Sequence, residues 1–375
     1  MKLALDCRSA CEGFHGIGRY TWSLLHEFTT LAGNHEVFCY FSHVSPPAPV
    51  NLPGNFRIRI CKAGMVDDRF DQFVLPGIIE EDEIDVYHNP TFSVPTIRGR
   101  TRIVSTVHDA VFARRPDLVA PRLREFLDSA TRRAGKLADR IITVSEFSKT
   151  DITGAYGISP DRVRVILNGV TPPPIGAANA GGPDAHRRLG IEGKKYILYV
   201  GSIEPKKNLG QLLGALDLLR AEDPNCPTLV VAGGLGADGE DILADLKRRE
   251  AAGQVVHAGY VSDADLEVLY AGAGLFVYPS LYEGFGLPPL EAMLRGVPTI
   301  VADATSLPEL VEHAALKVDP GNVQALAAAI SQVLGNEEIR RHLSEAGRSR
   351  AAMFTWKRSA AAHLEFYEEL AGVPR

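Results

Sequence analysis

Tyr278-Pro-Ser-Leu-Tyr-Glu-Gly-Phe-Gly-Leu-Pro-Pro-Leu-Glu291 is the most informative stretch of this 375-residue chain. It begins at the end of an apolar run, Gly274 to Tyr278, that is typical of a buried strand. Gly284 and Gly286 allow the backbone to turn tightly and to bring N–H groups close to a ligand. The paired prolines suit the first turn of a helix, where their missing N–H groups cost nothing. The stretch therefore predicts a strand, a glycine turn and a helix.

Two carboxylates flank the start of that helix, because Glu283 lies in the turn and Glu291 lies just inside the helix. A helix N-terminus is itself an anion site. A carboxylate can accept hydrogen bonds from two adjacent hydroxyls, and each such charge-assisted bond contributes roughly 1.5–3 kcal/mol. The pattern favours a ligand with diols at both ends and a diphosphate between them. Either glutamate alone would favour the simpler interpretation, an acidic residue that stabilises a helix start.

Composition and charge narrow the class of protein. The chain is too long for one ordinary core and long enough for two. Its formal net charge of −6 argues against a protein built mainly to bind nucleic acid. Five cysteines without paired metal-site spacing indicate reduced thiols. No run is long enough for a membrane span, and the N-terminus does not have the form of a signal peptide. We therefore expect a cytoplasmic protein.

The first half of the chain alternates apolar runs typical of strands with helical stretches. The runs are Leu3–Leu5, Val37–Phe41, Phe56–Ile60, Val86–His88, Ile103–Thr106 and Ile141–Val144. This alternation predicts a parallel, doubly wound sheet, whose ligands bind beyond the carboxyl ends of the strands. His88 and His108 both follow strands and are expected at that edge. A histidine in this position is more often a hydrogen-bonded structural group than a ligand contact.

A segment rich in proline and glycine, 168–183, predicts a domain boundary. A second alternating series follows it. Its strand-like runs are Tyr196–Val200, Leu229–Ala232, Val255–His257, Leu275–Tyr278, Thr299–Ala302 and Leu316–Val318. Two similar open sheets joined by one linker predict two domains with a cleft between them.

Three further turns follow strands and could face a phosphate. The first contains Gly16 and Gly18, the second is Gly201–Asn208, and the third is Gly233–Gly234. The second turn carries Lys206 and Lys207, which are well placed to neutralise a diphosphate. A tight turn or a solvated basic turn would explain each of these segments taken alone.

The stretch from Glu283 to Glu291 resembles the paired-glutamate motif of retaining glycosyltransferases in the large family four, which have the GT-B fold. The resemblance extends over nearly the whole chain. It implies an α/β protein made of two Rossmann-like domains with doubly wound parallel sheets that face each other across a cleft. The expected parts are an N-terminal acceptor domain (1–170), a linker (171–185), a C-terminal donor domain (186–355) and a last helix (356–372) that packs back on the first domain.

The resemblance also implies roles for individual residues. Glu291 is expected to hold the ribose diol of a nucleotide-diphosphate sugar, and Glu283 the hydroxyls of the transferred hexose. Lys207, helped by Lys206, is expected to stabilise the departing diphosphate, and His108 to position the sugar. His108, Lys207 and Glu283 are thus the candidate catalytic residues. The other expected donor contacts are Gly16, Gly18, Ser202, Gly233, Gly284, Phe285, Gly286 and Leu287.

One position departs from the family pattern. Many members carry an arginine directly after the first glycine of the Gly201 turn, whereas this chain has Ser202. Lys206 is the candidate for supplying the second positive charge. His108 itself leaves two roles open, since a neutral ring can donate to a sugar hydroxyl and a charged ring can offset developing negative charge.

No cofactor or metal is expected. Asp263-Ala-Asp265 has the spacing used by metal-dependent glycosyltransferases of a different fold, but it precedes a helical run. We interpret Ser262 or Asp263 as a helix cap with an acidic first turn. No protein nucleophile is evident, so retention is expected by analogy, with the leaving phosphate as the base for the acceptor hydroxyl.

The chain is most similar in its overall pattern to bacterial mannosyltransferases of surface polysaccharide assembly. This implies transfer of mannose from GDP-mannose to a glycan or lipid-linked acceptor. The alternatives are a UDP-glucose-dependent glucosyltransferase, a sugar phosphorylase, a nucleotide-sugar epimerase, and a sugar-binding protein without activity. Segment 121–140 has an apolar stripe and several arginines, which fits either a solvated helix face or peripheral contact with the inner face of an anionic membrane.

Overall fold

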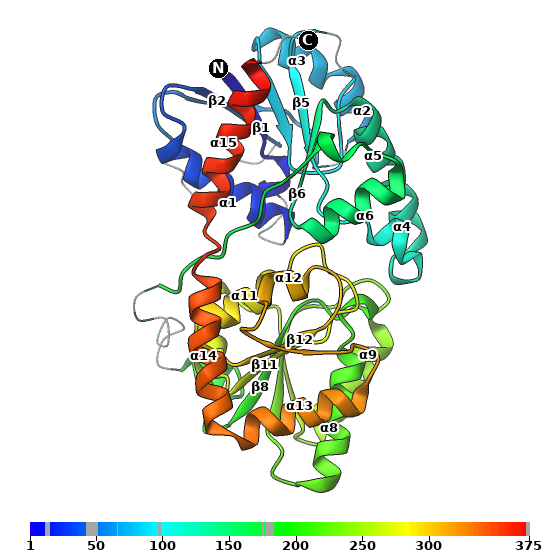
Figure 1. Cartoon of the computed structure of the whole chain (residues 1–375), viewed down its shortest axis with the longest axis vertical. Helices are drawn as coiled ribbons and strands as arrows, with labels where there is room; N and C mark the ends of the chain where they lie inside the picture. Colours follow the sequence, from blue (N-terminus) through cyan, green and yellow to red (C-terminus); the bar gives the residue numbers. More distant parts are fainter. Residues whose placement is uncertain are drawn as a thin grey trace. The chain divides into compact units, whose positions relative to one another are not determined.

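The computed structural model describes residues 1–11, 16–42, 52–65, 67–96, 99–174, 176 and 184–372 (Figure 1). The chain forms two compact units. The first comprises Met1–Pro116, Pro121–Gly169 and Phe354–Arg375, and the second comprises Asp117–Ala120 and Val170–Met353. Most of the predicted linker, 171–185, lies outside the described residues.

The first unit contains a seven-stranded parallel sheet in the order β3-β2-β1-β4-β5-β6-β7. Its strands are β1 (Lys2–Asp6), β2 (Glu36–Phe41), β3 (Phe56–Ile60), β4 (Val86–Asn89), β5 (Arg102–Thr106), β6 (Arg140–Thr143) and β7 (Val163–Val165). Every predicted strand of this half is present, whereas the short β7 was not predicted. The strand order reverses between β1 and β4, which is where ligands of such sheets bind.

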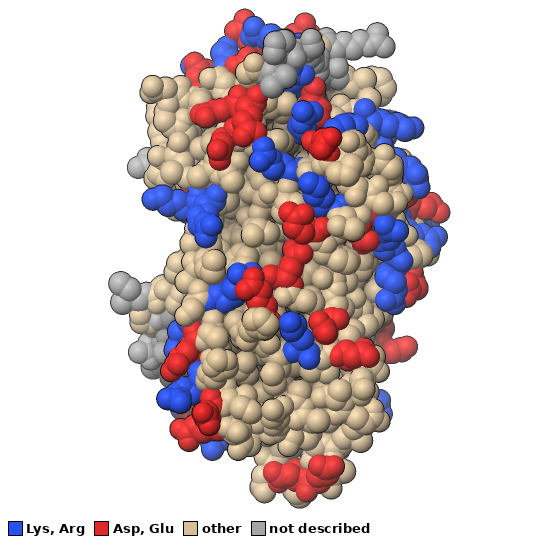
Figure 2. Space-filling model, viewed as in Figure 1, with Lys and Arg blue, Asp and Glu red and all other residues tan. Residues whose placement is uncertain are grey.

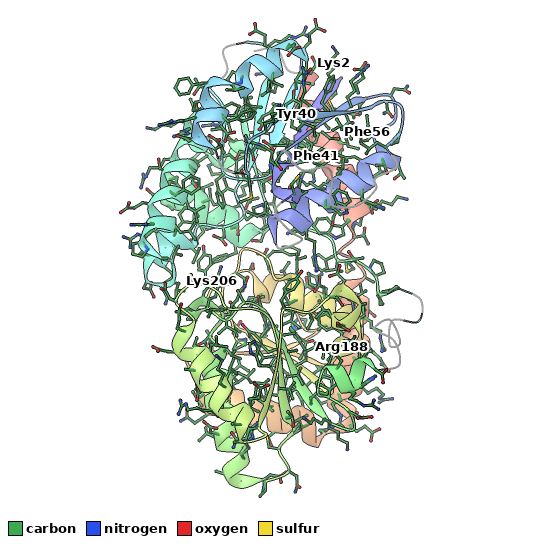
Figure 3. All side chains as sticks on the ribbon, turned by 180° about the vertical axis from the view of Figure 1, so that it is seen from behind. Lys2, Tyr40, Phe41, Phe56, Arg188 and Lys206 are labelled. Carbon is green, nitrogen blue, oxygen red and sulfur yellow. The ribbon has the colours of Figure 1, made fainter. Side chains whose placement is uncertain are left out.

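Helices connect these strands and cover the sheet (Figure 1). They are α1 (Ile17–Leu31), α2 (Asp68–Phe73), α3 (Leu75–Glu81), α4 (Val111–Arg114), α5 (Pro121–Leu137), α6 (Glu146–Tyr156) and α15 (Trp356–Gly372), with short 3-10 turns at Arg8–Cys11, Pro116–Leu118 and Pro160–Arg162. Ser145 caps α6, because its Oγ accepts from the Ser148 N–H at 3.0 Å. Tyr40 and Phe41 on β2 are fully buried in the core of this unit (Figure 3).

The C-terminal helix α15 packs on α1 in the first unit (Figure 1). The chain leaves this unit at Gly169 and returns to it at Phe354. A Cβ atom on Gly169 would lie 2.0 Å from the Trp356 amide nitrogen, so only glycine fits where the outgoing chain meets the first residue of α15.

A chain of buried hydrogen bonds attaches α15 to α1, β4 and β5. Ser359 supplies a carbonyl oxygen 2.7 Å from His363 Nδ1, so this nitrogen carries the proton and His363 Nε2 accepts from the Tyr20 hydroxyl at 2.7 Å. Tyr20 must then accept from Thr106 Oγ1, at 3.1 Å.

The donors of the remaining hydrogen bonds in this series follow in the same way. The hydroxyl of Thr106 already donates to Tyr20, so it accepts from His88 Nε2 at 2.8 Å. His88 Nδ1 is then unprotonated and accepts from the Tyr367 hydroxyl at 2.6 Å. Every donor in the chain points the same way, and both imidazoles are neutral. Burial lowers the pKa of both His88 and His363 in agreement with this arrangement.

The second unit contains a six-stranded parallel sheet in the order β10-β9-β8-β11-β12-β13. Its strands are β8 (Tyr196–Val200), β9 (Thr228–Ala232), β10 (Val255–Gly259), β11 (Leu275–Tyr278), β12 (Thr299–Ala302) and β13 (Leu316–Val318). All were predicted. The strand order reverses between β8 and β11, so the second ligand-binding edge lies beyond these two strands.

The helices of the second unit alternate with its strands. They are α7 (Ala185–Arg188), α8 (Leu209–Glu222), α9 (Glu240–Ala251), α10 (Asp263–Gly272), α11 (Leu287–Leu294), α12 (Leu307–Val311), α13 (Val323–Gly335) and α14 (Glu337–Ala351), with a 3-10 turn at Pro205–Lys207. Acidic and basic side chains are interspersed over the face drawn in Figure 2.

Candidate active site

The candidate site of the second unit lies at the carboxyl ends of β8 and β11. Lys206 and Lys207 are in the 3-10 turn after β8, and Glu283 follows β11 (Figure 3 labels Lys206). Asn208 ends the turn in a left-handed conformation, φ 56°. Its side-chain amide donates to the carbonyl oxygens of Pro279 and Pro320, which anchors the lysine turn to the loops after β11 and β13.

Lys207 and Glu283 form a buried ion pair. Lys207 Nζ lies 2.6 Å from Glu283 Oε1, and the two side chains are only 14% and 11% exposed. Tyr278 completes a triangle, since its hydroxyl accepts from Lys207 Nζ at 2.9 Å and donates to Glu283 Oε1 at 2.9 Å. Ser280 Oγ donates to the same carboxylate oxygen at 2.6 Å.

These contacts determine what the pair can offer a ligand. The ammonium of Lys207 has three N–H donors, and Glu283 and Tyr278 take two of them. One carboxylate oxygen, Oε1, already accepts three hydrogen bonds. Glu283 is therefore held in a fixed orientation, and among the described residues the third N–H of Lys207 is left to donate to a ligand.

Both groups stay ionised in this environment. Burial alone would raise the pKa of the Glu283 carboxyl, but the positive charges of Lys207 and Lys206 outweigh it and lower that pKa below its usual value. Burial likewise opposes the charge on Lys207, and the Glu283 carboxylate raises the lysine pKa. The site is preorganised as a cation beside an anion.

The glycine turn after Glu283 is held by the loop before α12. The Glu283 N–H donates to Thr305 Oγ1 at 3.1 Å, and Ser306 Oγ donates to the carbonyl oxygen of Phe285 at 2.5 Å. Thr305 has φ 56°, which is uncommon and strained for a β-branched residue and costs about 1–3 kcal/mol. Gly286 has φ 143°, and a Cβ there would lie 2.7 Å from the Leu307 side chain. Strain of this kind is concentrated at functional sites.

Glu291 lies in α11, and the paired prolines occupy the first turn of this helix as predicted. Glu291 is 7% exposed. Tyr270 Oη on α10 donates to Glu291 Oε2 at 3.0 Å. This hydrogen bond was not predicted, because Tyr270 and Glu291 lie on separate helices and no local sequence pattern connects them.

Ser202 does not replace the missing arginine charge. Its hydroxyl donates to Glu204 Oε1 at 2.9 Å, and Lys206 Nζ lies 4.0 Å from the same oxygen. Gly233 is required by close packing between turns, because a Cβ there would lie 1.9 Å from the Gly201 carbonyl oxygen. The turns that carry Gly201 and Gly233 are thus neighbours at the edge of the second sheet.

His108 lies directly beyond β5 in the first unit. Burial lowers its pKa, so the ring is neutral near pH 7. Its Nε2 lies 2.9 Å from the Pro90 carbonyl oxygen, which can only accept, so Nε2 carries the proton. The other nitrogen, Nδ1, is consequently an acceptor. Tyr20 packs edge-on against the ring with 5.0 Å between centroids.

The predicted glycine turn of the first unit is described in part. Gly16 precedes α1 with φ 44°, and Gly18 is buried in the first turn of that helix. Residues 12–15 lie outside the described residues. His88 fits the structural group that the sequence favoured, because its two ring nitrogens bond to Thr106 and Tyr367 in the buried hydrogen-bond chain.

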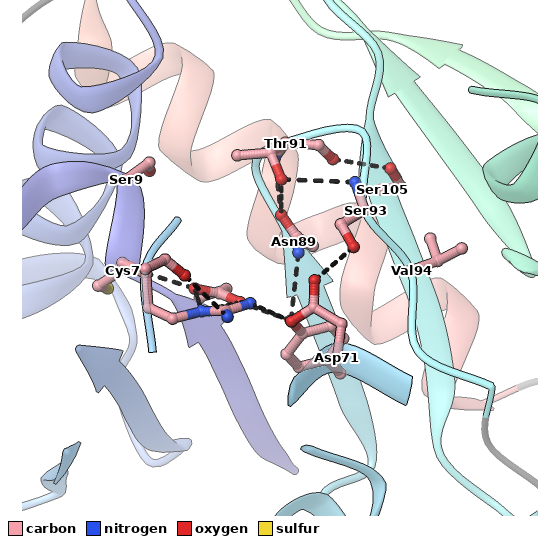
Figure 4. Close-up of polar contacts among 12 residues, drawn as sticks. Cys7, Ser9, Asp71, Asn89, Thr91, Ser93, Val94 and Ser105 are labelled. Atoms are coloured by element: carbon pink, nitrogen blue, oxygen red, sulfur yellow. Dashed lines mark hydrogen bonds and ion pairs between the residues drawn. The ribbon is translucent and has the colours of Figure 1, made fainter. Parts of the chain in front are cut away.

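A buried ionic network at the β1–β4 switch point was not predicted (Figure 4). Arg8 is 1% exposed and donates to Asp6 Oδ2 at 2.6 Å and to Asp71 Oδ1 at 2.7 Å. Ser93 Oγ donates to Asp71 Oδ2 at 2.5 Å. The network ties α2 and the loop after β4 to the end of β1. That loop also contains the Pro90 carbonyl that orients His108.

The Asp263-Ala-Asp265 segment forms the first turn of α10. Ser262 is the helix cap, since its hydroxyl accepts from the Asp265 N–H at 3.1 Å, as predicted. Asp265 pairs with Arg188. Within the described ranges, no three histidine, cysteine or acidic side chains come together as metal ligands, and no helix is long and apolar enough to cross a bilayer.

Comparison with known proteins identifies relatives of both halves. Residues 14–172 match the model described as "Glycosyltransferase Family 4", and residues 183–350 match "Glycosyl transferases group 1". O-antigen chain mannosyltransferase B of Escherichia coli is 33% identical over 76% of this chain and 74% of its own length. Serotype-specific mannosyltransferase WbdA of Escherichia coli is 29% identical over 88% of this chain. The match spans only 41% of the longer WbdA.

The solved structure of sucrose-phosphate synthase from Thermosynechococcus elongatus superposes on this chain with a TM-score of 0.76. The superposition covers 99% of both chains at 20% sequence identity. Together with the two doubly wound parallel sheets, this likeness confirms the predicted GT-B fold.

Proposed function

This chain belongs to the group 1 glycosyltransferases of family 4, and we propose that it moves mannose from GDP-mannose to a hydroxyl of a glycan or lipid-linked acceptor with retention. The observation that carries this proposal is the buried cluster of Lys207, Glu283 and Tyr278 at the switch point of the second sheet. It places a preorganised cation beside a fixed carboxylate. A nucleotide-diphosphate sugar has phosphates that a cation can bind and sugar hydroxyls that a carboxylate can bind.

Lys207 would stabilise the departing diphosphate. Negative charge builds up on the phosphates as the bond to the sugar breaks, and a cation already in place lowers that barrier without rearrangement. The one remaining N–H of Lys207 suits a phosphate oxygen. Lys206 adds a second positive charge near Lys207. Its charge reaches the site, because it also lowers the pKa of Glu283.

The two glutamates would hold the two ends of the donor. Glu283 is fixed through one oxygen, so its carboxylate can accept hexose hydroxyls in one defined orientation. Glu291 lies in the first turns of α11, where a diol of the ribose would donate to it. The glycine turn and the start of α11 between them suit the diphosphate.

His108 would position the hexose from the first unit. Its protonated nitrogen donates to the Pro90 carbonyl oxygen, so the ring can accept a hydrogen bond from a sugar hydroxyl through Nδ1. This supports an uncharged, accepting role rather than the donating or charged roles that the sequence left open.

Several observations support the choice of mannose and of a metal-free reaction. The relatives named above are mannosyltransferases, which supports mannose as the transferred sugar. Lys206 and Lys207 provide the positive charge that a metal would supply in another fold. We therefore propose that transfer proceeds unchanged in EDTA, with the leaving phosphate taking the proton of the acceptor hydroxyl.

A thermal-shift panel tests the donor. A ligand that binds only the folded protein raises its melting temperature by mass action. GDP and GDP-mannose should give the largest shifts among GDP, UDP, ADP and their sugars. A larger shift with UDP-glucose would instead favour a glucosyltransferase.

Product analysis tests the reaction. Release of GDP from GDP-mannose should require an added acceptor, and the product should retain the anomeric configuration of the donor. An epimerase would change the donor sugar without an acceptor, and a phosphorylase would require inorganic phosphate. Either result would overturn the proposal.

We also propose that α5 contacts an anionic membrane surface. Leu123 and Phe126 at the start of this helix are 48% and 37% exposed, and Arg122 and Arg124 lie on either side of Leu123. The apolar stripe predicted for this helix is buried only at Ala130 and Ala134, together with the neighbouring Thr131. Exposed apolar and basic groups on one helix suit the headgroup region of an anionic bilayer.

A further inference from the structure

Tyr270 and Glu291 join α10 to α11 directly behind the proposed ribose site. The Tyr270 hydroxyl donates to Glu291 Oε2 at 3.0 Å, and a weaker contact at 3.5 Å reaches the Pro288 carbonyl oxygen in the first turn of α11. Tyr270 is 1% exposed, so this hydroxyl needs a buried acceptor. The hydrogen bond restricts rotation of the Glu291 carboxylate about its last side-chain bond.

A second layer fixes the tyrosine ring. Arg295 Cζ lies 5.0 Å from the ring centroid of Tyr270, and its guanidinium makes two bonds to the Glu267 carboxylate, one of them 2.7 Å long. The same guanidinium donates to the Glu291 carbonyl oxygen at 3.0 Å. Glu267 and Tyr270 are three residues apart, and Glu291 and Arg295 are four apart, so each pair lies on one helix face.

We propose that Tyr270 is a positioning residue for recognition of the ribose diol. This inference rests on the proposed function, in which Glu291 receives the two ribose hydroxyls. Two adjacent hydroxyls can both reach a carboxylate only when its plane has one orientation. Tyr270 sets that orientation through Oε2, and Arg295 with Glu267 keeps the ring of Tyr270 in place.

A single substitution can separate the effect of Tyr270 on ribose recognition from its effect on folding. Tyr270→Phe keeps the ring and its contact with Arg295, and removes only the hydroxyl. Loss of the hydroxyl should weaken binding of a ligand that has the diol, and should not affect a ligand that lacks it. A residue that only stabilises the fold would affect both ligands equally.

The experiment uses isothermal titration of the full chain with the nucleoside diphosphate that stabilises it most in the thermal-shift panel, GDP being expected. The second ligand is the 2′,3′-dideoxy form of the same nucleotide. We expect the wild type to bind the dideoxy form at least tenfold more weakly, since charge-assisted bonds are lost. Tyr270→Phe should weaken binding of the parent nucleotide by about tenfold and leave the dideoxy affinity within about twofold of the wild type.

Tyr196→Phe is the matched control. Tyr196 is also buried in the second unit, and its hydroxyl donates to the Leu269 carbonyl oxygen at 2.7 Å, one residue before Tyr270. This variant loses a comparable buried hydrogen bond. We expect it to bind both nucleotides like the wild type, even if its melting temperature falls.

Glu291→Gln distinguishes failure of this inference from failure of the proposed function. If Glu291→Gln selectively weakens the parent nucleotide and Tyr270→Phe does not, the role of Tyr270 is wrong and that of Glu291 stands. If neither variant selectively weakens binding of the parent nucleotide, or if no nucleoside diphosphate binds the wild type, both are wrong. Equal weakening of both ligands by Tyr270→Phe also overturns the positioning role.

Discussion

Lys207 and Glu283 are each other's counter-ion in a buried site, so removing one leaves the other charge uncompensated. Lys207→Ala should lower the turnover of the transferase at least roughly tenfold, because one charge-assisted contact to the departing diphosphate is lost. Initial rates of GDP release in the presence of an acceptor measure this effect.

Lys195→Ala is the control for this substitution, since Lys195 is an exposed lysine of the same unit. The double variant Lys207→Ala/Glu283→Gln should lose much less activity than the product of the two single losses, because the two residues act as one unit. An unchanged rate in Lys207→Ala would remove this lysine from the mechanism.

Lys206 is the candidate for supplying the positive charge that an arginine at position 202 would provide. Its ammonium is close enough to lower the pKa of Glu283. We expect Lys206→Ala to weaken GDP binding about three- to tenfold and to leave guanosine binding unchanged, because only the diphosphate interacts with this charge. Titration calorimetry with both ligands at two salt concentrations measures this. An equal loss for guanosine would show that Lys206 supports the loop instead of the phosphates.

The residues of the site that could be predicted are those that form a local sequence pattern. Glu283, Gly286 and Glu291 fall within one turn and helix, and Lys207 lies in one strand-to-helix turn. Tyr270 and Thr305 could not be assigned roles, because their contacts with Glu291 and Glu283 join separate elements. The partners of Arg8 illustrate the same limit, since Asp71 is 63 residues away.

At the scale of elements, the stability of the packing of α15 on the first unit should depend on pH. Burial lowers the pKa of His363 to about 4 from its ordinary value of 6.5. The unfolded chain therefore binds more protons between these values, and the free energy of unfolding falls as pH falls from 6.5 to about 4. His363 contributes about 3 kcal/mol to this loss, and nothing above pH 6.5. His88 acts in the same direction.

Tryptophan fluorescence measures this pH effect in urea. Both tryptophans, Trp22 and Trp356, belong to the first unit, so the signal reports that unit. His363→Gln should reduce the change in stability between pH 7 and pH 4.5, whereas His26→Gln, at an exposed position, should not. A pH dependence identical in wild type and His363→Gln would contradict the assignment of His363 as a neutral buried group.

Helix α5 should bind anionic vesicles through its first turns. Each basic residue near such a surface contributes about 1 kcal/mol. Arg122→Glu/Arg124→Glu should therefore weaken binding to phosphatidylglycerol vesicles at least tenfold in a sedimentation assay. Lys194→Glu/Lys195→Glu makes the same charge change at exposed positions of the second unit and should have little effect. Binding that is equal for neutral and anionic vesicles would contradict the proposal.

Most elements were predictable because apolar runs and helical periodicity are local properties. The missed strand β7 is three residues long, and its central Arg164 is exposed, so it lacks an apolar run. The stripe of α5 was predicted correctly as periodicity, but Leu123 and Phe126 remain exposed. Periodicity identifies a face, whereas burial depends on which other element covers that face.

At the scale of the whole molecule, the chain must leave the first unit and return to it beside Gly169. Gly169→Ala would place a Cβ against the Trp356 amide and should destabilise the first unit by about 1–3 kcal/mol. The urea midpoint of tryptophan fluorescence should fall, while GDP affinity stays within about twofold.

Gly54→Ala is the control, because no described atom lies within 4 Å of the added Cβ. It should leave the urea midpoint unchanged. A Gly169→Ala variant as stable as the wild type would show that the backbone near Trp356 shifts without cost. The two sheets were predictable from alternation, and the family resemblance implied the return of the last helix. The close approach of Gly169 to Trp356 was not predicted, because these positions are far apart in the chain.

The one-way series of hydrogen bonds from Tyr367 to Ser359 also constrains how this protein can be redesigned. Each interior residue of the series donates one hydrogen bond and accepts one. Replacing any of them would therefore leave a neighbouring buried group without its donor or its acceptor. A design that replaces the C-terminal helix must therefore keep five residues together: Tyr20, His88, Thr106, His363 and Tyr367.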